Sequence, residues 1–216
     1  MRIRSTFGVA CVATGGLLLG SVSDAVEVLK NSSFEEPVDT GSGYNWVSDR
    51  AVHWERWGGW FNRETTWSPV LSGQCMMAYH HWRIQGNDTS GIYQDIGDAP
   101  AGQPYTFGIK VMKDKGANAE YVEIRLESCL GGQTLASKMI RMPEMKGGKW
   151  TPVSISAIPP TKGIRVLVIT KPGHAPQRKG AIKFDDASFT VETNRAVLAT
   201  LKATQNRNAL GIIRRK

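Results

Sequence analysis

The chain has 216 residues, of which 41% are hydrophobic and 21% are charged, and its formal net charge is +8. This length suits one domain of the β-sandwich type and is enough to bury a core. The charge is uneven, because the first 25 residues carry a net +1 and the last 25 a net +5, which leaves +2 for the body. Since a nucleic-acid reader concentrates basic residues on its folded domain, we expect no nucleic-acid partner.

Residues 1–25 are typical of a secretory signal peptide. Two arginines form a basic start, residues 7–20 are mostly apolar, and Ser23 and Ala25 stand where a signal peptidase reads small residues. The apolar run is shorter than the roughly 20 residues of a spanning helix, and glycines interrupt it. We therefore expect an exported mature chain that begins near Val26, without a transmembrane segment, in the periplasm, outside the cell or on the cell surface.

Export changes the meaning of the cysteines. Once Cys11 is removed with the signal peptide, Cys75 and Cys129 remain, an even number in an oxidising compartment. The sequence predicts a disulfide between them, which would close a loop of about 55 residues and stabilise the fold by roughly 3–4 kcal/mol. The alternative is two buried free thiols on different strands.

Six of the seven tryptophans lie within residues 46–82. An indole ring can fill a core, or it can be a platform on which the C–H face of a sugar stacks. We expect Trp54 and Trp57 to be mostly buried, whereas the polar neighbours of Trp67 and Trp82 favour exposure.

The same region ends in a histidine pair, His80 and His81. Neighbouring side chains of a strand point to opposite faces, so the two imidazoles would not share a metal ion. No sequence signature of a metalloprotease or of a serine hydrolase occurs. All four histidines are predicted to be polar residues of the surface or of sheet edges.

Strand-like segments follow. In residues 104–112, Tyr105, Phe107 and Ile109 alternate with more polar residues, as expected of a strand with one buried face. Turn residues separate this strand from residues 90–96, which predicts a hairpin of the two. Further strands are predicted at residues 26–30, 121–127, 134–140, 150–158, 164–170 and 181–191. Their spacing indicates a β-sandwich.

The order of four short motifs resembles a known family. These are Asn31-x-x-Phe34-Glu35, the GIYQDI of residues 91–96, the AGQPYTF of residues 101–107 and the IKFDDASF of residues 182–189. In this order they resemble the carbohydrate-binding modules of the galactose-binding-like jelly-roll superfamily, of the families 4, 9 and 22 type. The resemblance covers residues 26–191 and implies an all-β jelly roll of two antiparallel sheets. It leaves residues 192–216 as a basic tail, helical or solvated.

The resemblance also implies a ligand and an ion. Similar modules bind polysaccharides or cell-surface glycans through aromatic platforms and polar partners, which here would be Trp67, Tyr79, Trp82, Arg83, Gln85 and Gln94. They also often hold a structural calcium where the first and last strands meet, which points to Glu35 and Asp185 as ligands. The alternative is that these two carboxylates bond to backbone or to basic side chains.

We therefore expect a secreted, non-catalytic polysaccharide-binding protein without an attached enzyme. A second reading is a cell-surface module with a structural or protein-interaction role, because the superfamily also hosts such proteins. A third is a polysaccharide lyase that uses Tyr79 with His80 or His81 as base and acid.

Overall fold

The computed structural model describes residues 24–36, 46–48, 51–59, 61–65, 70–80, 88–173 and 179–193. The strands in this part of the chain are β1 (Asp24–Glu27), β2 (Trp46–Ser48), β3 (Glu55–Trp57), β4 (Phe61–Glu64), β5 (Met76–Tyr79), β6 (Ser90–Ile96), β7 (Tyr105–Lys113), β8 (Tyr121–Ser128), β9 (Thr134–Arg141), β10 (Thr151–Ala157), β11 (Ile164–Lys171) and β12 (Ile182–Thr193). A 3-10 helix, η2 (Met142–Glu144), lies between β9 and β10. Within the described residues, no helix is both long and apolar enough to cross a membrane.

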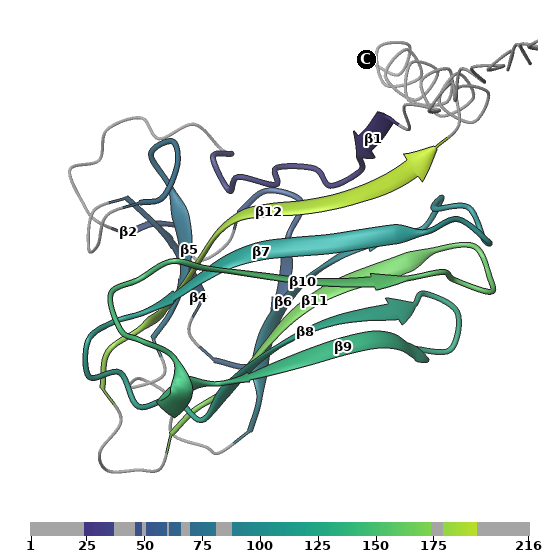
Figure 1. The fold of residues 1–216 in the computed structure, drawn as a ribbon. Coiled ribbons are helices and arrows are strands. Elements are labelled where there is room, and N and C mark those ends of the chain that lie inside the picture. The colour runs from purple at the N-terminus through teal and green to yellow at the C-terminus, as the bar shows by residue number, and fades with distance from the viewer. Residues whose placement is uncertain are drawn as a thin grey trace, which may run out of the picture.

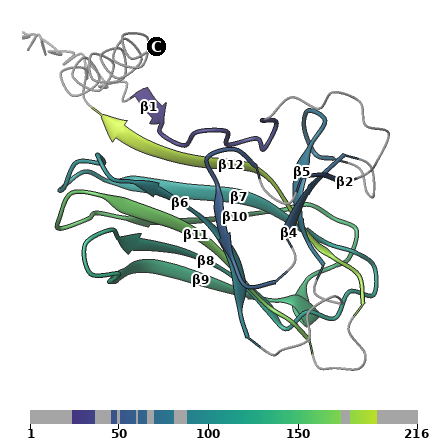
Figure 2. The same cartoon turned by 180° about the vertical axis from the view of Figure 1, so that it is seen from behind.

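The strands form two antiparallel sheets. The seven-stranded sheet has the order β10-β7-β12-β5-β4-β2, with β1 also paired to β12, and the five-stranded sheet has the order β3-β6-β11-β8-β9. Figures 1 and 2 show β4 and β5 running steeply at one end of the molecule, while β7, β10 and β12 sweep along its length. The predicted all-β sandwich is confirmed.

The core lies between the sheets and follows from the alternation of side chains along each strand. On β7, Tyr105, Phe107 and Ile109 are at most 2% exposed, and on β11 alternate residues from Ile164 onward are fully buried. Phe34, the aromatic residue of the first motif, is also fully buried. Its ring centroid lies 5.2 Å from that of Trp54, the tryptophan that was correctly expected to be buried.

The predicted hairpin of residues 90–96 and 104–112 is wrong. Both segments are strands, but β6 pairs with β3 and β11, whereas β7 pairs with β10 and β12 in the other sheet. The turn residues between them carry the chain from one sheet to the other. Alternation identifies the buried face of a strand, but it does not identify the neighbouring strand.

The predicted disulfide is also wrong, because Cys75 and Cys129 are both free thiols. Cys75 is buried directly before β5, and its Sγ accepts a hydrogen bond from Arg63 Nη1 at 3.1 Å. Cys129 is exposed directly after β8 in the other sheet, with its Sγ 3.9 Å from Asp95 Oδ1. The two thiols have different partners in different sheets.

The ends of the described domain meet. Asp24 pairs with Thr193 and Glu27 with Thr190, so β1 closes the seven-stranded sheet against the end of β12. The paired region is slightly longer at both ends than the predicted domain of residues 26–191. The predicted signal peptide, apart from its last two residues, and the basic tail from residue 194 lie outside the described residues.

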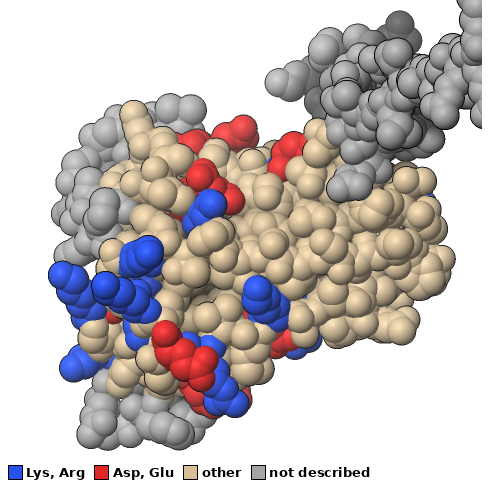
Figure 3. Space-filling view, viewed as in Figure 1, with Lys and Arg blue, Asp and Glu red and all other residues tan. Residues whose placement is uncertain are grey.

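On the face shown in Figure 3, charged side chains gather toward the end of the sandwich where η2 lies, and both signs are mixed there. Much of the remaining described surface in this view is uncharged. The described residues thus present no continuous basic stripe on this face, as expected from the nearly neutral body of the chain.

Candidate functional site

A polar cluster lies on the outward face of the seven-stranded sheet. It consists of Asn62, Glu64, His80, Asp114 and Lys183. On β4, Phe61 faces the core, so Asn62 and Glu64 point away from it, because side chains alternate along a strand. The core position of Tyr79 likewise places His80 on the outward side.

The register brings residues from four strands into one row. Asn62 pairs with Ala78, Ala78 with Lys183, and Lys183 with Met112, which links β4, β5, β12 and β7. Neighbouring strands lie about 4.8 Å apart, so the row is roughly 14 Å long. An extended ligand could therefore contact several strands along this row.

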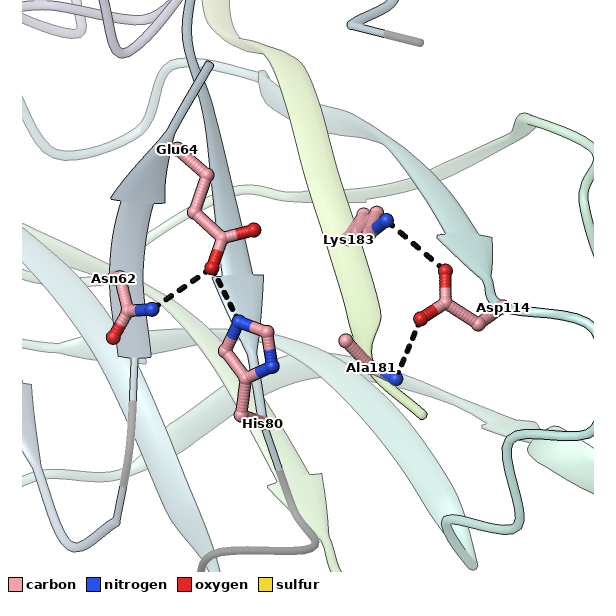
Figure 4. A network of polar contacts seen from close by, with 6 residues as sticks. All are labelled: Asn62, Glu64, His80, Asp114, Ala181 and Lys183. Atoms are coloured by element: carbon pink, nitrogen blue, oxygen red, sulfur yellow. Dashed lines mark hydrogen bonds and ion pairs between the residues drawn. The ribbon is translucent and has the colours of Figure 1, made fainter. Parts of the chain in front are cut away.

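Glu64 is the centre of the cluster. Its Oε1 accepts a hydrogen bond from Asn62 Nδ2 at 2.8 Å and also contacts His80 Nε2 (Figure 4). The Glu64 side chain is fully buried, and its other oxygen, Oε2, has no hydrogen-bond partner among the described residues. A buried polar atom without a partner costs free energy, and a carboxylate oxygen needs a donor. Glu64 Oε2 is thus a buried acceptor without a donor among the described residues.

Lys183 supplies a fixed positive charge on the same face. Its Nζ lies 3.0 Å from Asp114 Oδ1, and the side chain is only 1% exposed. Asp114 Oδ2 in turn accepts the backbone amide of Ala181 at 2.9 Å, so the carboxylate is held from both sides (Figure 4). His80 links the buried Glu64 to solvent, because His80 contacts the Glu64 carboxylate and the His80 side chain is 14% exposed.

Trp150 extends this face toward β10. It directly precedes β10, whose first residue pairs with Val111, and so Trp150 stands level with Met112. The residue is partly exposed, and its Nε1 is a buried donor for which the described part of the chain supplies no acceptor. This sheet therefore has two buried polar atoms without a partner among the described residues: the acceptor Glu64 Oε2 on β4 and the donor Nε1 of Trp150 beside β10.

The structure places two of the predicted sugar-contacting residues away from any outward face. Tyr79 is fully buried in the core. Gln94 is 6% exposed, and its side-chain amide bonds to both the backbone N–H and the C=O of Lys30 at 2.9 Å. Gln94 thus holds the segment after β1 in place by two hydrogen bonds to the backbone of Lys30. Trp67, Trp82, Arg83 and Gln85 lie outside the described residues.

The proposed calcium ligands hold backbone instead. Glu35 Oε1 accepts the amides of Gln74 and Cys75, each at 3.0 Å. Asp185 accepts the amides of Leu71, Ser72 and Asp186 at 2.8–3.1 Å (three hydrogen bonds in all). Both carboxylates therefore fix residues 71–75 against the sheet.

This donor set does not fit calcium as it stands. Amide hydrogens point at Oε1 of Glu35 and at both oxygens of Asp185, and calcium needs six to eight oxygen ligands. Burial raises the pKa of Asp185 to about 6, against the lowering effect of its amide partners. Among the described residues, no group of three or more His, Cys, Asp or Glu side chains is placed to hold a metal ion.

Sequence reasoning missed most of the cluster. Asn62 and Glu64 had no motif, Lys183 was part of the closing motif but was given no role, and Trp150 stood outside the tryptophan-rich segment. The available signal was the alternation Phe61-Asn62-Arg63-Glu64, which is short. His80 was predicted as an ordinary surface or edge residue, but it contacts a buried carboxylate.

Comparison with known proteins identifies the fold. No protein-family model and no curated protein matches the sequence. An arabinose-bound GH51 α-L-arabinofuranosidase superposes with a TM-score of 0.57 and 16% identity, over 79% of this chain and 27% of that one. A family 61 carbohydrate-binding module in complex with β-1,4-galactotriose gives a TM-score of 0.50 and 19% identity, over 76% of this chain and 97% of that one.

A CBM22-1 xylan-binding domain from Paenibacillus barcinonensis Xyn10C gives a TM-score of 0.46 and 14% identity, over 74% of this chain and 92% of that one. The chain thus spans about a quarter of the arabinofuranosidase and nearly the whole of the two binding modules. The fold is the jelly roll of the carbohydrate-binding modules, which confirms the resemblance seen in the sequence.

Proposed function

We propose that this protein is a non-catalytic polysaccharide-binding module whose ligand lies across the outward face of the seven-stranded sheet. The observation that carries the proposal is the unpartnered Oε2 of the buried Glu64. A hydroxyl group of a sugar is a donor of the right kind, and a site built around a buried polar group discriminates strongly against ligands that lack the matching group. Lys183 and His80 frame this acceptor.

The same geometry supports binding over catalysis by Tyr79 and His80, while His81, the other histidine of the lyase reading, lies outside the described residues. A lyase that pairs Tyr79 with His80 would need both side chains at one substrate, but Tyr79 is buried in the core and His80 is on the opposite side of the sheet. The charges of Lys183 and Asp114 are paired with each other. The described cluster is arranged to hold hydroxyl groups by hydrogen bonds.

The fold supports the proposal because it is shared with a module bound to β-1,4-galactotriose, a neutral sugar. The alternative of a structural or protein-interaction module predicts no affinity for any glycan. Export to the periplasm, the medium or the cell surface belongs to the same proposal, since polysaccharides of cell walls are outside the cytoplasm.

Calorimetric titration with neutral oligosaccharides such as galactan, xylan and β-glucan fragments tests the proposal. We expect Glu64→Gln to weaken binding by roughly 1–3 kcal/mol, because the amide offers a donor at one of its two positions in place of an acceptor. Leu71→Ala, at an exposed residue outside the cluster, is the matched control and should bind as the wild type does. Absence of binding to all of these glycans would favour the structural alternative.

A further inference from the structure

A buried arginine contacts a buried cysteine where β4 and β5 lie side by side. Arg63 on β4 is fully buried, and Cys75, which directly precedes β5, is 1% exposed. Arg63 alternates with Asn62 and Glu64 along its strand, so it lies on the core side of the sheet. The arginine and the cysteine are therefore separate from the polar cluster on the outward face.

One nitrogen of the guanidinium makes the hydrogen bonds that Arg63 forms with the described residues. Its Nη1 donates to the backbone oxygens of Phe34 at 3.4 Å and Glu35 at 3.0 Å, and to Cys75 Sγ at 3.1 Å. Its Nε and Nη2 are buried and have no partner in the described chain. Two of the three acceptors are uncharged carbonyl oxygens. Among these partners, Cys75 Sγ is thus the one that can carry a negative charge.

A buried guanidinium requires such a charge. It stays protonated at every pH at which a protein is folded, and a buried charge without a counter-charge is strongly destabilising. Arg165 shows the usual solution, since its Nε and Nη2 donate to the two oxygens of Asp95 at 2.6 and 2.8 Å. Arg63 has no carboxylate partner of this kind among the described residues. A thiolate at Cys75 supplies the charge, and a neighbouring arginine favours that ionised form of a cysteine.

Glu35 does not fill this role, although its backbone oxygen accepts a hydrogen bond from Arg63. Its carboxylate Oε1 accepts the amides of Gln74 and Cys75, each at 3.0 Å. The Glu35 side chain therefore holds the backbone of Cys75, while Arg63 holds the sulfur. The position of Sγ against Nη1 is thus fixed from two sides.

Cys75 lies directly behind an exposed segment. Gly73 and Gln74 are exposed, Leu71 is 38% exposed, and Cys75 is the first buried residue after them. An opening of this short segment, without unfolding of the sandwich, brings small solutes to the sulfur. Access to Cys75 therefore requires only a local opening.

Cys129 provides a comparison within the same chain. It is exposed, directly after β8 in the other sheet. Partial burial and Asp95, whose Oδ1 lies 3.9 Å from Sγ, raise the pKa of the Cys129 thiol, against a smaller lowering by Arg165. Cys129 is thus more accessible than Cys75 but is mostly protonated at neutral pH. Accessibility and ionisation favour different cysteines.

We propose that Cys75 is an oxidation site, a thiolate held by Arg63 that reacts with hydroperoxides to give a sulfenate. The thiolate attacks one peroxide oxygen, so that the S–O bond forms while the O–O bond breaks, and the leaving hydroxide takes the sulfenic proton to become water. The sulfur loses two electrons and the peroxide gains them. The product keeps its negative charge beside Arg63, which can donate Nε–H or Nη2–H to the added oxygen. This site goes beyond the proposed function and does not depend on it.

Treatment of the full chain with hydrogen peroxide at pH 6, 7 and 8 tests the proposal. After catalase removes the peroxide, the protein is unfolded with dimedone, which labels sulfenic acids, and peptide mass spectrometry measures the label at each cysteine. We expect Cys75 to be labelled faster than Cys129 at pH 6, with a rate that changes by less than about twofold up to pH 8, because Cys75 is already ionised. The rate at Cys129 should rise by roughly tenfold per pH unit, as its ionised fraction does.

Three variants separate the effect of the charge from that of stability. Arg63→Met removes the charge and should make the rate at Cys75 rise with pH as steeply as that at Cys129, whereas Arg63→Lys should keep it nearly constant. Val122→Ala, in the core on β8, is the matched control for lost stability. Its rate at Cys75 should equal that of the wild type, because the site reacts in the folded protein.

Each outcome decides for or against the site. A rate at Cys75 that rises with pH in parallel with that at Cys129 would overturn the thiolate, and labelling of Cys129 without Cys75 would overturn the oxidation site. A faster rate in Val122→Ala, in proportion to the lost stability, would place the reaction in the unfolded chain and also overturn it. If Arg63→Met does not fold, the pH dependence of the wild type alone decides. These measurements involve no glycan, so they leave the proposed function untouched.

Discussion

Tyr105→Phe should remove a pH dependence of the stability of this fold that can be worked out from the structure. Tyr105 is 1% exposed, its hydroxyl donates to Pro100 O at 3.2 Å, and its ring stacks on Phe189 at 5.1 Å. Burial, with a contribution from Asp98, raises the pKa of the phenol from 10.0 to about 12. The substitution keeps the ring and removes the titrating group together with its hydrogen bond.

The sign follows from proton linkage. Between pH 10 and 12 the unfolded chain releases the Tyr105 proton while the folded chain keeps it, so the wild type loses stability as the pH rises through this window and is unaffected below it. Each pH unit in the window costs about 1.4 kcal/mol. At pH 8 the variant should be less stable than the wild type by about 1 kcal/mol, the value of a neutral hydrogen bond. Above about pH 11 the variant should therefore be more stable than the wild type.

Urea unfolding of both proteins at pH 8, 10, 11 and 11.5 measures the difference directly, and other titrating groups cancel in it. Tyr121→Phe is the control. Burial and Glu123 also raise the pKa of Tyr121, but its side chain is only partly buried, so we expect a smaller change in the same direction. A difference between wild type and Tyr105→Phe that stays constant from pH 8 to 11.5 would refute the reasoning.

Three further predictions concern the core, the cysteines and the calcium ion. Phe34→Ala should lower the free energy of unfolding in urea by about 3–5 kcal/mol, because it leaves a cavity beside Trp54, and a loss below about 1 kcal/mol would contradict the core position. Dithiothreitol should not change the melting temperature. In the chain from Val26 onward, which lacks Cys11, two thiols should react in the unfolded protein without reductant, whereas a disulfide would give none. Because Glu35 and Asp185 accept hydrogen bonds from backbone amides, the melting temperature should be the same in calcium as in a chelator. A clearly higher melting temperature in calcium would support the calcium site predicted from the sequence.

Strands that are long and alternating could be predicted from the sequence. The bounds of β6 were predicted in full and those of β7, β8, β9 and β11 to within one residue, because seven to nine residues contain enough alternation to define a buried face. The strands β2 to β5 have only three or four residues each and lie in a segment where tryptophans obscure the pattern. Pairing could not be predicted, since β7 takes both of its neighbours from more than 30 residues further along the chain.

The candidate site was less predictable than the fold because its residues gain their meaning only from pairing. Asn62 and Lys183 are 121 positions apart, yet both pair with Ala78. Gln94 shows the converse: its motif and residue type favour a ligand contact, but its amide is used by Lys30. Local sequence defines which groups are available, and the sheet order defines which of them meet.

The two faces of the sandwich differ in how their polar groups are satisfied, and this difference bears on their functions. On the outer face of the five-stranded sheet, Arg165 and Asp95 are paired with each other and remain partly exposed, with side-chain exposures of 37% and 46%. At Glu64 the acceptor is buried and lacks a donor among the described residues, so a ligand that supplies the donor gains much more than one that does not. Selectivity for one glycan should therefore depend on Glu64.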